Sequence, residues 1–429
     1  MAKLIVERFY YGDFEPVGTL SSENILDLSF TYNESYRSKP NAVSLSLSLP
    51  LSQVHFDTEK TLPFFEGLLP EGPALESIRR ELRIPAYDLL NLLRALGAEA
   101  IGAIRIGEEE ELHRVGPGYT PLTDEDIDLL SERGELIAPD FLKKARLSLA
   151  GAQHKVGLYI PDNPFTKMEY FLPDGVAAST HIIKTASQSF KGIIFNEGYC
   201  LALARACGLT VPDSDIITAA QPMLALRRFD RIINESCRLY DGLPGPLRLH
   251  QEDFSQALGI EPTRKYEAGD NDYPKLIAEL LRMNSANPLK DIEDLALFMA
   301  FNYLVGNCDN HIKNLSLVYS EDYLTIRLAP FYDVLCTTMY ALDREMGLRI
   351  GSTRLIDQIN RDDFTLLGSS LGVGGRRMLG LLDDMRERLD LALKSSVAKD
   401  QLGVYRAADH VVSEISQSAK QRIEAIGAF

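Results

Sequence analysis

Residues 306–314 read GNCDNHIKN, a polar stretch between an apolar helical pattern at 292–304 and an apolar strand pattern at 315–319. Glycine commonly ends a helix, so we expect the polar residues after Gly306 to lie on a loop. Asp309 and Asn314 are five positions apart, as in kinase catalytic loops. There the aspartate accepts or orients the proton of the attacking hydroxyl, and the asparagine oxygen binds magnesium. A network of Asx turns is the alternative interpretation of the same spacing.

Residues 315–333, which follow this loop, favour a metal site over a network of turns. Strand patterns at 315–319 and 323–328 flank Ser-Glu-Asp, which predicts a hairpin that carries the chain back to its starting point. This hairpin is followed by Asp333, which we therefore expect close to Asp309 and Asn314. Kinases place their second metal-binding aspartate after such a hairpin. Three oxygen ligands on two loops predict a magnesium site.

A kinase also needs a cation for the phosphates and a loop to cover them. Lys184 ends the strand pattern HIIK at 181–184, and a lysine at this point either reaches into a cleft or bends back to solvent. Residues 148–155 read SLAGAQHK, and their small side chains allow close backbone approach to phosphates. Both features are compatible with an ATP site.

Composition limits the class of protein. The 429 residues are 45% hydrophobic and 25% charged, which excludes a disordered or collagen-like chain. A net charge of −16 makes the surface a poor non-specific ligand for nucleic acid or anionic membrane. We expect no membrane span and no signal peptide, and the five cysteines without C-x-x-C spacing predict free thiols. The expected location is the cytoplasm.

The patterns change from β-rich to helical along the chain. We predict an α+β, two-lobed fold with a β-rich N-terminal subdomain over 1–138, a first lobe over 139–247 and an all-α C-terminal lobe over 248–429. Within the subdomain, Tyr11–Asp13 is expected to form a hairpin turn. The alternation of Val43–Leu49 predicts a strand, and Phe64–Pro70 is expected to be a joint between elements.

An ordered set of blocks resembles the HipA family, the serine/threonine kinase toxins of bacterial HipBA modules. The set spans about 145 to 335, and each block is weak alone. Residues 45–50 and 64–70 also resemble the N-terminal subdomain of this family. The blocks are SLAGAQHK at 148–155, HIIK at 181–184, the expected helix 196–207 with Gly208-Leu209 after it, RFDR at 228–231, RLHQEDF at 248–254, GNCDNHIKN at 306–314 and LAPFYD at 328–333.

The resemblance implies a protein-kinase-like fold, ATP and Mg²⁺ as cofactors, and specific roles. Asp309 would be the catalytic base, Asn314 and Asp333 the magnesium ligands, and Lys184 the phosphate contact. Ala150, Gly151, Ala152 and Gln153 would cover the phosphates, and the hinge of Leu226, Arg227 and Phe229 would hold adenine, although Arg227 stands where the family often has glutamate.

Other residues receive roles from the resemblance as well. Ser148 would be the autophosphorylation site, whose phosphate would drive the loop out of the site and be captured by Lys143, Lys144 and Arg146. By analogy with other kinases, and not from the family blocks, Glu197 would pair with Lys184, unless it only complements a helix N-terminus. Gln251, Glu252, Asp253 and His311 are candidates for support of the site, with no role derivable from the sequence.

The resemblance also implies partners. These are a HipB-like helix-turn-helix antitoxin, which would supply the only DNA contact, and a protein substrate of the aminoacyl-tRNA synthetase class. Three alternatives remain open: a small-molecule or lipid phosphotransferase, a catalytically weak antitoxin-binding co-repressor, and a metal-dependent phosphohydrolase that uses the same carboxylates.

Overall fold

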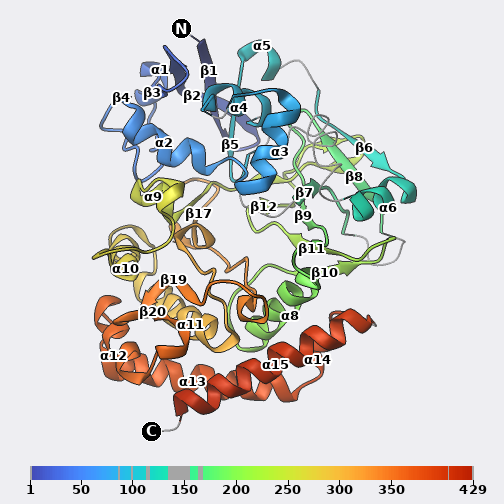
Figure 1. The fold of residues 1–429 in the computed structure, drawn as a ribbon. Helices are drawn as coiled ribbons and strands as arrows, with labels where there is room; N and C mark the ends of the chain where they lie inside the picture. Colours follow the sequence, from blue (N-terminus) through green and yellow to red (C-terminus); the bar gives the residue numbers. More distant parts are fainter. Residues whose placement is uncertain are drawn as a thin grey trace.

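A computed structural model of the chain describes residues 2–85, 87–97, 100–112, 116–133, 155–162, 168–403 and 405–427. The chain descends from an N-terminal β subdomain, through a central sheet, to a helical base (Figure 1). The segment 148–153, with Ser148 and the proposed phosphate-covering residues, lies outside the described residues, as do Lys143, Lys144 and Arg146.

The N-terminal subdomain is an antiparallel five-stranded sheet with the strand order β4-β3-β2-β1-β5, covered by short helices. The hairpin expected at Tyr11–Asp13 is confirmed: Tyr11 and Gly12 have φ angles of 46° and 90°, the left-handed pair of a two-residue turn. The elements are β1 (Ala2–Tyr10), β2 (Asp13–Ser22), β3 (Ser29–Tyr32), α1 (Glu34–Arg37), β4 (His55–Phe56), α2 (Thr58–Gly67), α3 (Gly72–Leu82), α4 (Leu89–Leu96), β5 (Ile104–Gly107) and α5 (Glu109–Leu112).

Two sequence expectations for this subdomain are wrong. Val43–Leu49 is an irregular segment, because side chains satisfy its backbone: the Leu45 amide donates to the Tyr32 hydroxyl at 2.7 Å and the Leu47 amide to Glu252 at 3.1 Å. Most of Phe64–Pro70 is helical, since α2 continues through Pro63 and buries Phe64 and Phe65. Leu45 and Leu49 are buried in this segment without forming a strand.

The first lobe centres on an antiparallel four-stranded sheet in the order β10-β11-β9-β7, which shares a hydrophobic core with the N-terminal subdomain. In this sheet Lys155 lies directly opposite Lys184 on the neighbouring strand. The sheet strands are β7 (Lys155–Leu158), β9 (His181–Lys184), β10 (Ser214–Ile217) and β11 (Met223–Arg227). Helices and two-stranded ribbons surround this sheet. They are α6 (Asp124–Arg133), α8 (Ile193–Ala206), β6–β8 (Gly118–Leu122, Tyr170–Asp174), β12–β15 (Arg231–Ile232, Leu247–Arg248) and β13–β14 (Leu239–Tyr240, Leu243–Pro244).

The second lobe is mainly helical but not all-α. The hairpin expected over 315–328 is confirmed as β17 and β18, and β16 extends it to three strands. A separate pair, β19 and β20, was not expected from the sequence. The elements are β16 (Gln251–Asp253), α9 (Phe254–Leu258), α10 (Tyr273–Asn284), α11 (Pro288–Val305), β17 (Ser316–Tyr319), β18 (Ile326–Leu328), β19 (Glu345–Ile350), β20 (Thr353–Leu355), α12 (Arg361–Ser370), α13 (Gly375–Lys394), α14 (Val397–Asp400) and α15 (Arg406–Gly427).

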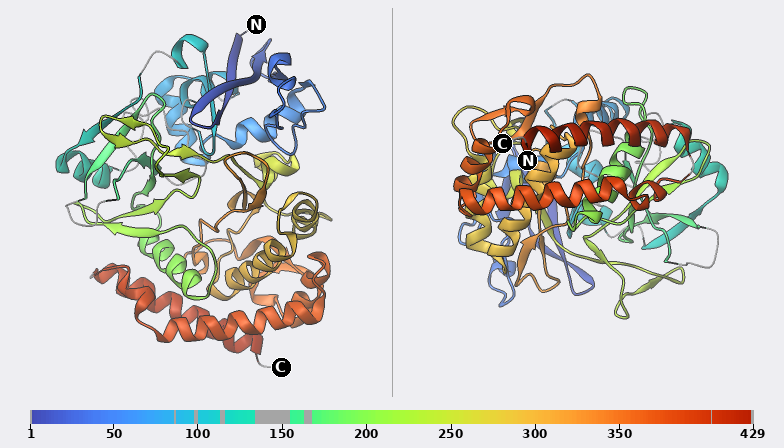
Figure 2. Two further views of the ribbon diagram at one scale, coloured as in Figure 1. Left: turned by 180° about the vertical axis from the view of Figure 1, so that it is seen from behind. Right: turned by 90° about the horizontal axis from the view of Figure 1, so that it is seen from below.

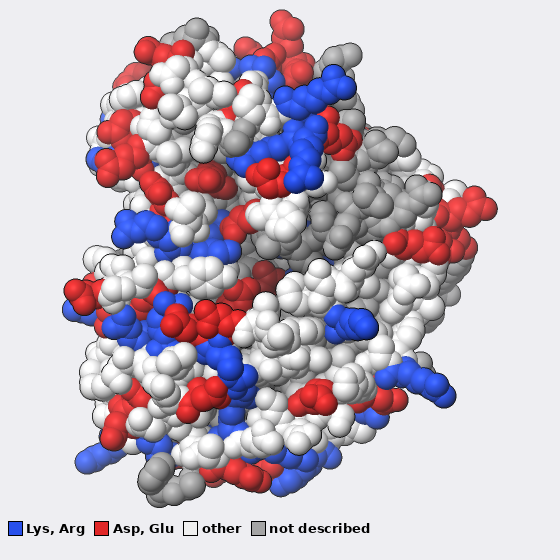
Figure 3. All heavy atoms as spheres, viewed as in Figure 1, with Lys and Arg blue, Asp and Glu red and all other residues white. Residues whose placement is uncertain are grey.

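Long amphipathic helices close the base of the molecule. Helices α13 and α15 lie side by side there, and α15 also packs on α8 (Figure 2). Their buried residues join α11 in the largest hydrophobic core. In the described part of the chain, no helix is both long and apolar enough to cross a bilayer. On the face shown in Figure 3, acidic and basic side chains are interspersed rather than gathered into one basic surface.

Candidate active site

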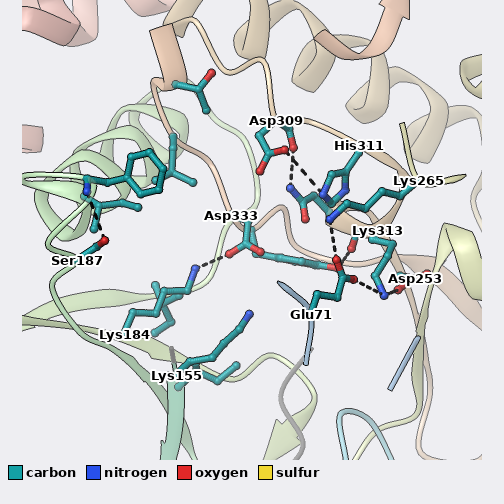
Figure 4. Close-up of a pocket in the computed structure, with 18 of the residues that line it drawn as sticks. Glu71, Lys155, Lys184, Ser187, Asp253, Lys265, Asp309, His311, Lys313 and Asp333 are labelled. Carbon is teal, nitrogen blue, oxygen red and sulfur yellow. Dashed lines mark hydrogen bonds and ion pairs between the residues drawn. The ribbon is translucent and has the colours of Figure 1, made fainter. Parts of the chain in front are cut away.

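A cavity of about 870 Å³ lies where the N-terminal subdomain and the two lobes meet. Charged side chains from all three parts point into it (Figure 4). Its lining brings together most of the candidates that fall on described residues: Lys184, Leu226, Arg227, Phe229, Gln251, Asp253, Asp309, His311, Asn314 and Asp333. Glu252 is completely buried behind this lining.

Lys184 is at the centre of an ion-pair cluster. Its Nζ lies 2.6 and 2.8 Å from the two carboxylate oxygens of Glu197 on α8, and it also bonds Asp333 Oδ1. The expected Lys184–Glu197 pair is thus confirmed. Burial would lower the pKa of Lys184, but the charges of Asp333 and Glu197 outweigh it and raise that pKa. The lysine is therefore held as a cation beside Asp333.

Lys155 is a second lysine of the cavity, and its place there was not predicted from the 148–155 block that it ends. Its cross-strand position puts it on the same side of the sheet as Lys184, and both point towards Asp333 in Figure 4. Burial is the main reason that its pKa is lowered, with the charge of Lys184 acting in the same direction. The two lysines together make a positively charged wall.

The 306–314 loop presents Asp309 to the cavity. Its side chain is 48% exposed, and Oδ1 accepts a 2.6 Å bond from the Tyr266 hydroxyl. Partial desolvation in the cavity raises the pKa of Asp309, while the Tyr266 bond and the charge of Lys265 oppose that rise. The Asn314 amide donates to the Asp309 backbone carbonyl at 2.8 Å. This local bond resembles the Asx-type network that was the alternative interpretation, and it orients the Asn314 side chain.

Asp333 follows the hairpin, as expected, and enters the same cavity. Its φ angle of 52° is in the left-handed region, which is strained for a residue with a side chain. The charges of Lys184 and Lys155 outweigh the effect of burial and lower the pKa of Asp333, so its carboxylate is ionised. The preceding Tyr332 donates to the backbone carbonyl of Lys313 at 2.9 Å, which ties this segment to the 306–314 loop.

The donor set of Asp333 and Asn314 fits magnesium. A carboxylate and an amide carbonyl are hard oxygen ligands, and Mg²⁺ commonly takes one or two protein carboxylates and completes its shell with water and phosphate oxygens. Among the described residues, no three His, Cys, Asp or Glu side chains form a ready-made metal cage. Such a partial donor set suits an ion that arrives with a phosphate ligand.

Two functional features were missed by sequence reasoning. Glu71, at the start of α3, lies 2.8 Å from Lys313 and 2.7 Å from Lys265. Tyr266 bonds Asp309 and packs edge-to-face on His311, with ring centroids 5.0 Å apart. The turn residues around Glu71 indicate the start of a helix. No local pattern, however, marks Glu71 or Tyr266 as part of a site.

The Gln251-Glu252-Asp253 signature connects parts of the molecule. Gln251 donates to Asp230 at 3.2 Å, and Asp253 lies 3.6 Å from Lys313 while its side chain caps α9. Glu252 accepts bonds from the Ser46 hydroxyl, the Leu47 amide and the Tyr319 hydroxyl. Glu252 therefore supports the docking of the N-terminal subdomain, Asp253 supports the 306–314 loop, and Gln251 connects this strand to Asp230 of the first lobe.

Glu252 should make stability depend on pH. Burial, despite three donated bonds, raises the pKa of Glu252 from 4.5 to about 7. Between these values the native protein binds a proton that the unfolded chain releases, so the free energy of unfolding should fall as pH rises from 4.5 to about 7. Glu252→Gln should remove about 3 kcal/mol of this fall, measured by urea unfolding across the range. Asp253 also has a raised pKa, about 6, and should contribute equally to the pH dependence of both proteins. Equal pH dependence of wild type and variant would therefore contradict the assignment to Glu252.

The expected hinge lies at the end of β11. The backbone amides of Arg227 and Arg228 donate to Asp213 and Thr180 at 2.8 and 2.9 Å, so they are not available to a ligand. The Arg227 side chain forms a two-bond pair with Asp162 at 2.8 and 2.6 Å, away from the hinge backbone. Phe229 stacks on Tyr332, with ring centroids 6.0 Å apart.

His311, on the 306–314 loop, is buried, and its Nε2 lies 3.9 Å from Asp309 Oδ1. Burial lowers the pKa of His311 to about 3, so the ring is neutral. It packs the loop against Tyr266 rather than supplying charge.

Comparisons with known proteins agree with this architecture. Two family models match, the HipA-like C-terminal domain over residues 147–393 and the HipA N-terminal domain over residues 10–107. Y4mE of Sinorhizobium fredii, which is named as a kinase, is 34% identical over 395 residues, covering 89% of this chain and 90% of the relative. The serine/threonine-protein kinase toxin HipA of Shewanella oneidensis is 27% identical over 351 residues, or 79% of this chain and 77% of the relative.

A solved structure confirms the fold. A chain of the Shewanella oneidensis complex of HipA, HipB and operator DNA superposes with a TM-score of 0.80 at 23% identity, covering 99% of this chain and 98% of that chain. The α+β, kinase-like fold expected from the sequence is therefore correct. Because one family model spans more than half of the residues, and a relative of at least 30% identity is matched over nearly its whole length, the chain belongs to the HipA family.

Proposed function

We propose that this protein is a serine/threonine kinase that transfers the γ-phosphate of ATP to a protein hydroxyl. The proposal rests on one juxtaposition: Lys184, which is paired with the buried Glu197, lines a single cavity between the lobes together with Asp309, Asn314 and Asp333. In the transfer, the bond between the γ-phosphorus and the bridging oxygen breaks, a bond to the acceptor oxygen forms, and the acceptor proton passes to Asp309. The exposed carboxylate of Asp309 is accessible for that role.

The remaining roles follow from charge and position. Lys184 and Lys155 would bind phosphate oxygens, and Ala150, Gly151, Ala152 and Gln153 would cover them. Asn314 and Asp333 would hold Mg²⁺, which when bound would neutralise charge on the phosphates. Lys184 would then exchange part of its bond with Asp333 for a phosphate oxygen. Adenine would lie against the hinge and bond the Phe229 amide.

Regulation and partners are part of the same proposal. Ser148 would accept a phosphate from the enzyme itself, and the charge of about −2 would be repelled from bound ATP. A HipB-like helix-turn-helix antitoxin would bind the protein and make the DNA contact, because the solved relative with the same fold is described in complex with HipB and operator DNA. The target would be a protein of the aminoacyl-tRNA synthetase class, phosphorylated on serine or threonine.

The test is incubation of purified protein with Mg-ATP, followed by intact mass and peptide mapping. We expect a gain of one phosphate, on Ser148, and no gain when the magnesium is chelated. Consumption of a metabolite or lipid without protein modification would favour a small-molecule kinase. Steady release of free phosphate would favour a phosphohydrolase, and binding of an antitoxin without any ATP turnover would favour a co-repressor.

A further inference from the structure

The N-terminal subdomain reaches the 306–314 loop through one carboxylate. Glu71 follows α2 and precedes α3, and it points into the cavity beside Lys313 and Lys265 (Figure 4). Its Oε1 is 2.8 Å from Lys313 Nζ, and its Oε2 is 2.7 Å from Lys265 Nζ. A single side chain from the subdomain thus contacts two cations of the kinase part.

Lys313 is the connection between this carboxylate and the site. It directly precedes Asn314, and its side chain is only 4% exposed. Besides Glu71, its Nζ is 3.4 Å from the Gly67 carbonyl at the end of α2 and 3.6 Å from Asp253. Its backbone carbonyl accepts the bond from Tyr332, the neighbour of Asp333. Lys313 therefore joins the subdomain to both predicted magnesium ligands.

Lys265 makes a second connection. The Ile312 amide of the loop donates to the Lys265 backbone carbonyl at 3.4 Å, and the next residue, Tyr266, bonds Asp309. Glu71 therefore fixes segment 265–266 as well as the loop. Both routes from Glu71 end on residues of the transfer site.

We propose that Glu71 is a positioning residue through which the N-terminal subdomain holds the 306–314 loop in the arrangement needed for transfer. This inference rests on the proposed kinase function. A nearly buried ammonium requires an anion, and without Glu71 only Asp253, at 3.6 Å, would remain for Lys313 among the described residues. The pKa of Glu71 is consistent with this. Burial alone would raise that pKa, but the charges of Lys313 and Lys265 outweigh the effect of burial and lower it to about 2.

The kinetic test compares Glu71→Gln with Glu76→Gln. Glutamine keeps the size of the side chain and removes the charge. Glu76 lies on α3, the helix that begins directly after Glu71; it pairs with Arg79 at 2.8 Å and is 51% exposed. Because small displacements of reacting groups are costly, Glu71→Gln should lower kcat on the order of 10- to 100-fold. The KM for ATP should be unchanged, and Glu76→Gln should match the wild type. Wild-type kcat in Glu71→Gln, or a higher one, would overturn the proposal.

A second test needs no activity. Hydrogen exchange followed by mass spectrometry should show faster exchange over 309–316 in Glu71→Gln than in Glu76→Gln, with exchange over 181–184 unchanged. Lys313→Met should give the same loss of kcat, and the double variant should lose no more than either single one. Additive losses, or unchanged exchange over 309–316, would overturn the inference. A wild-type protein that transfers no phosphate would instead refute the kinase assignment, while the exchange data would still decide the role of Glu71.

Discussion

Asp309→Asn is expected to lower the rate of phosphoryl transfer by about 10²- to 10⁴-fold, the usual contribution of a positioned general base. Asparagine retains an oxygen for the Tyr266 bond and the size of the side chain, so the loop should stay folded. It has no carboxylate to receive the acceptor proton. The measurement is the initial rate of protein phosphorylation with Mg-ATP, followed by intact mass.

The control for this prediction is Asp215→Asn. Asp215 is exposed on β10 and does not line the cavity, so its replacement should leave the rate unchanged. Thermal unfolding of both variants should match the wild type, which separates loss of chemistry from loss of fold. Equal rates for the wild type and Asp309→Asn would show that another group receives the proton.

Lys184→Met is expected to have the largest effect on stability and also to abolish transfer. Glu197 is 1% exposed, and removal of its cation would leave a buried charge without compensation. Breaking a buried ion pair in this way typically costs about 3–5 kcal/mol of unfolding free energy. Urea unfolding measures the loss, and the exposed Lys275→Met on α10 provides a control that should unfold like the wild type.

A double variant isolates the cause of this loss. Glu197→Gln added to Lys184→Met removes the uncompensated charge and should recover much of the unfolding free energy, but not the transfer activity. If Lys184→Met alone were as stable as the wild type, the ion pair would contribute little to folding. If it retained phosphate release from ATP, the phosphohydrolase alternative would be favoured over a kinase.

Much of the site could be predicted because its residues lie on short local elements. Asp309 and Asn314 belong to one loop after a helix, and the hairpin of β17 and β18 necessarily returns the chain, which places Asp333 beside them. Lys184 ends an apolar strand whose period is visible in the sequence. The Lys184–Glu197 pair required one further step, an analogy with other kinases, and the structure confirms it.

The predictions for 43–49 and 64–70 failed. In the first, an alternation of apolar residues predicted a strand, although such alternation has more than one cause. Leu45 and Leu49 are buried and Val43 and Leu47 are partly buried, but hydrogen bonds to Tyr32 and Glu252 hold the segment in an irregular path. Helix α2 tolerates Pro63 because the aromatic residues after it enter a buried core. In both cases tertiary contacts outweighed local propensity.

The sequence alone determined which chemical groups the protein carries, in which order, and on which loops, since these depend on spacing and periodicity over a few residues. Only the tertiary structure decided how distant groups meet. Glu71 contacts Lys313, and Ser46 contacts Glu252, in each case across more than 200 positions of sequence. Tyr266 bonds Asp309 across 43 positions. Such contacts depend on how separately formed elements pack around one cavity, and nothing in the local pattern of either partner specifies the other.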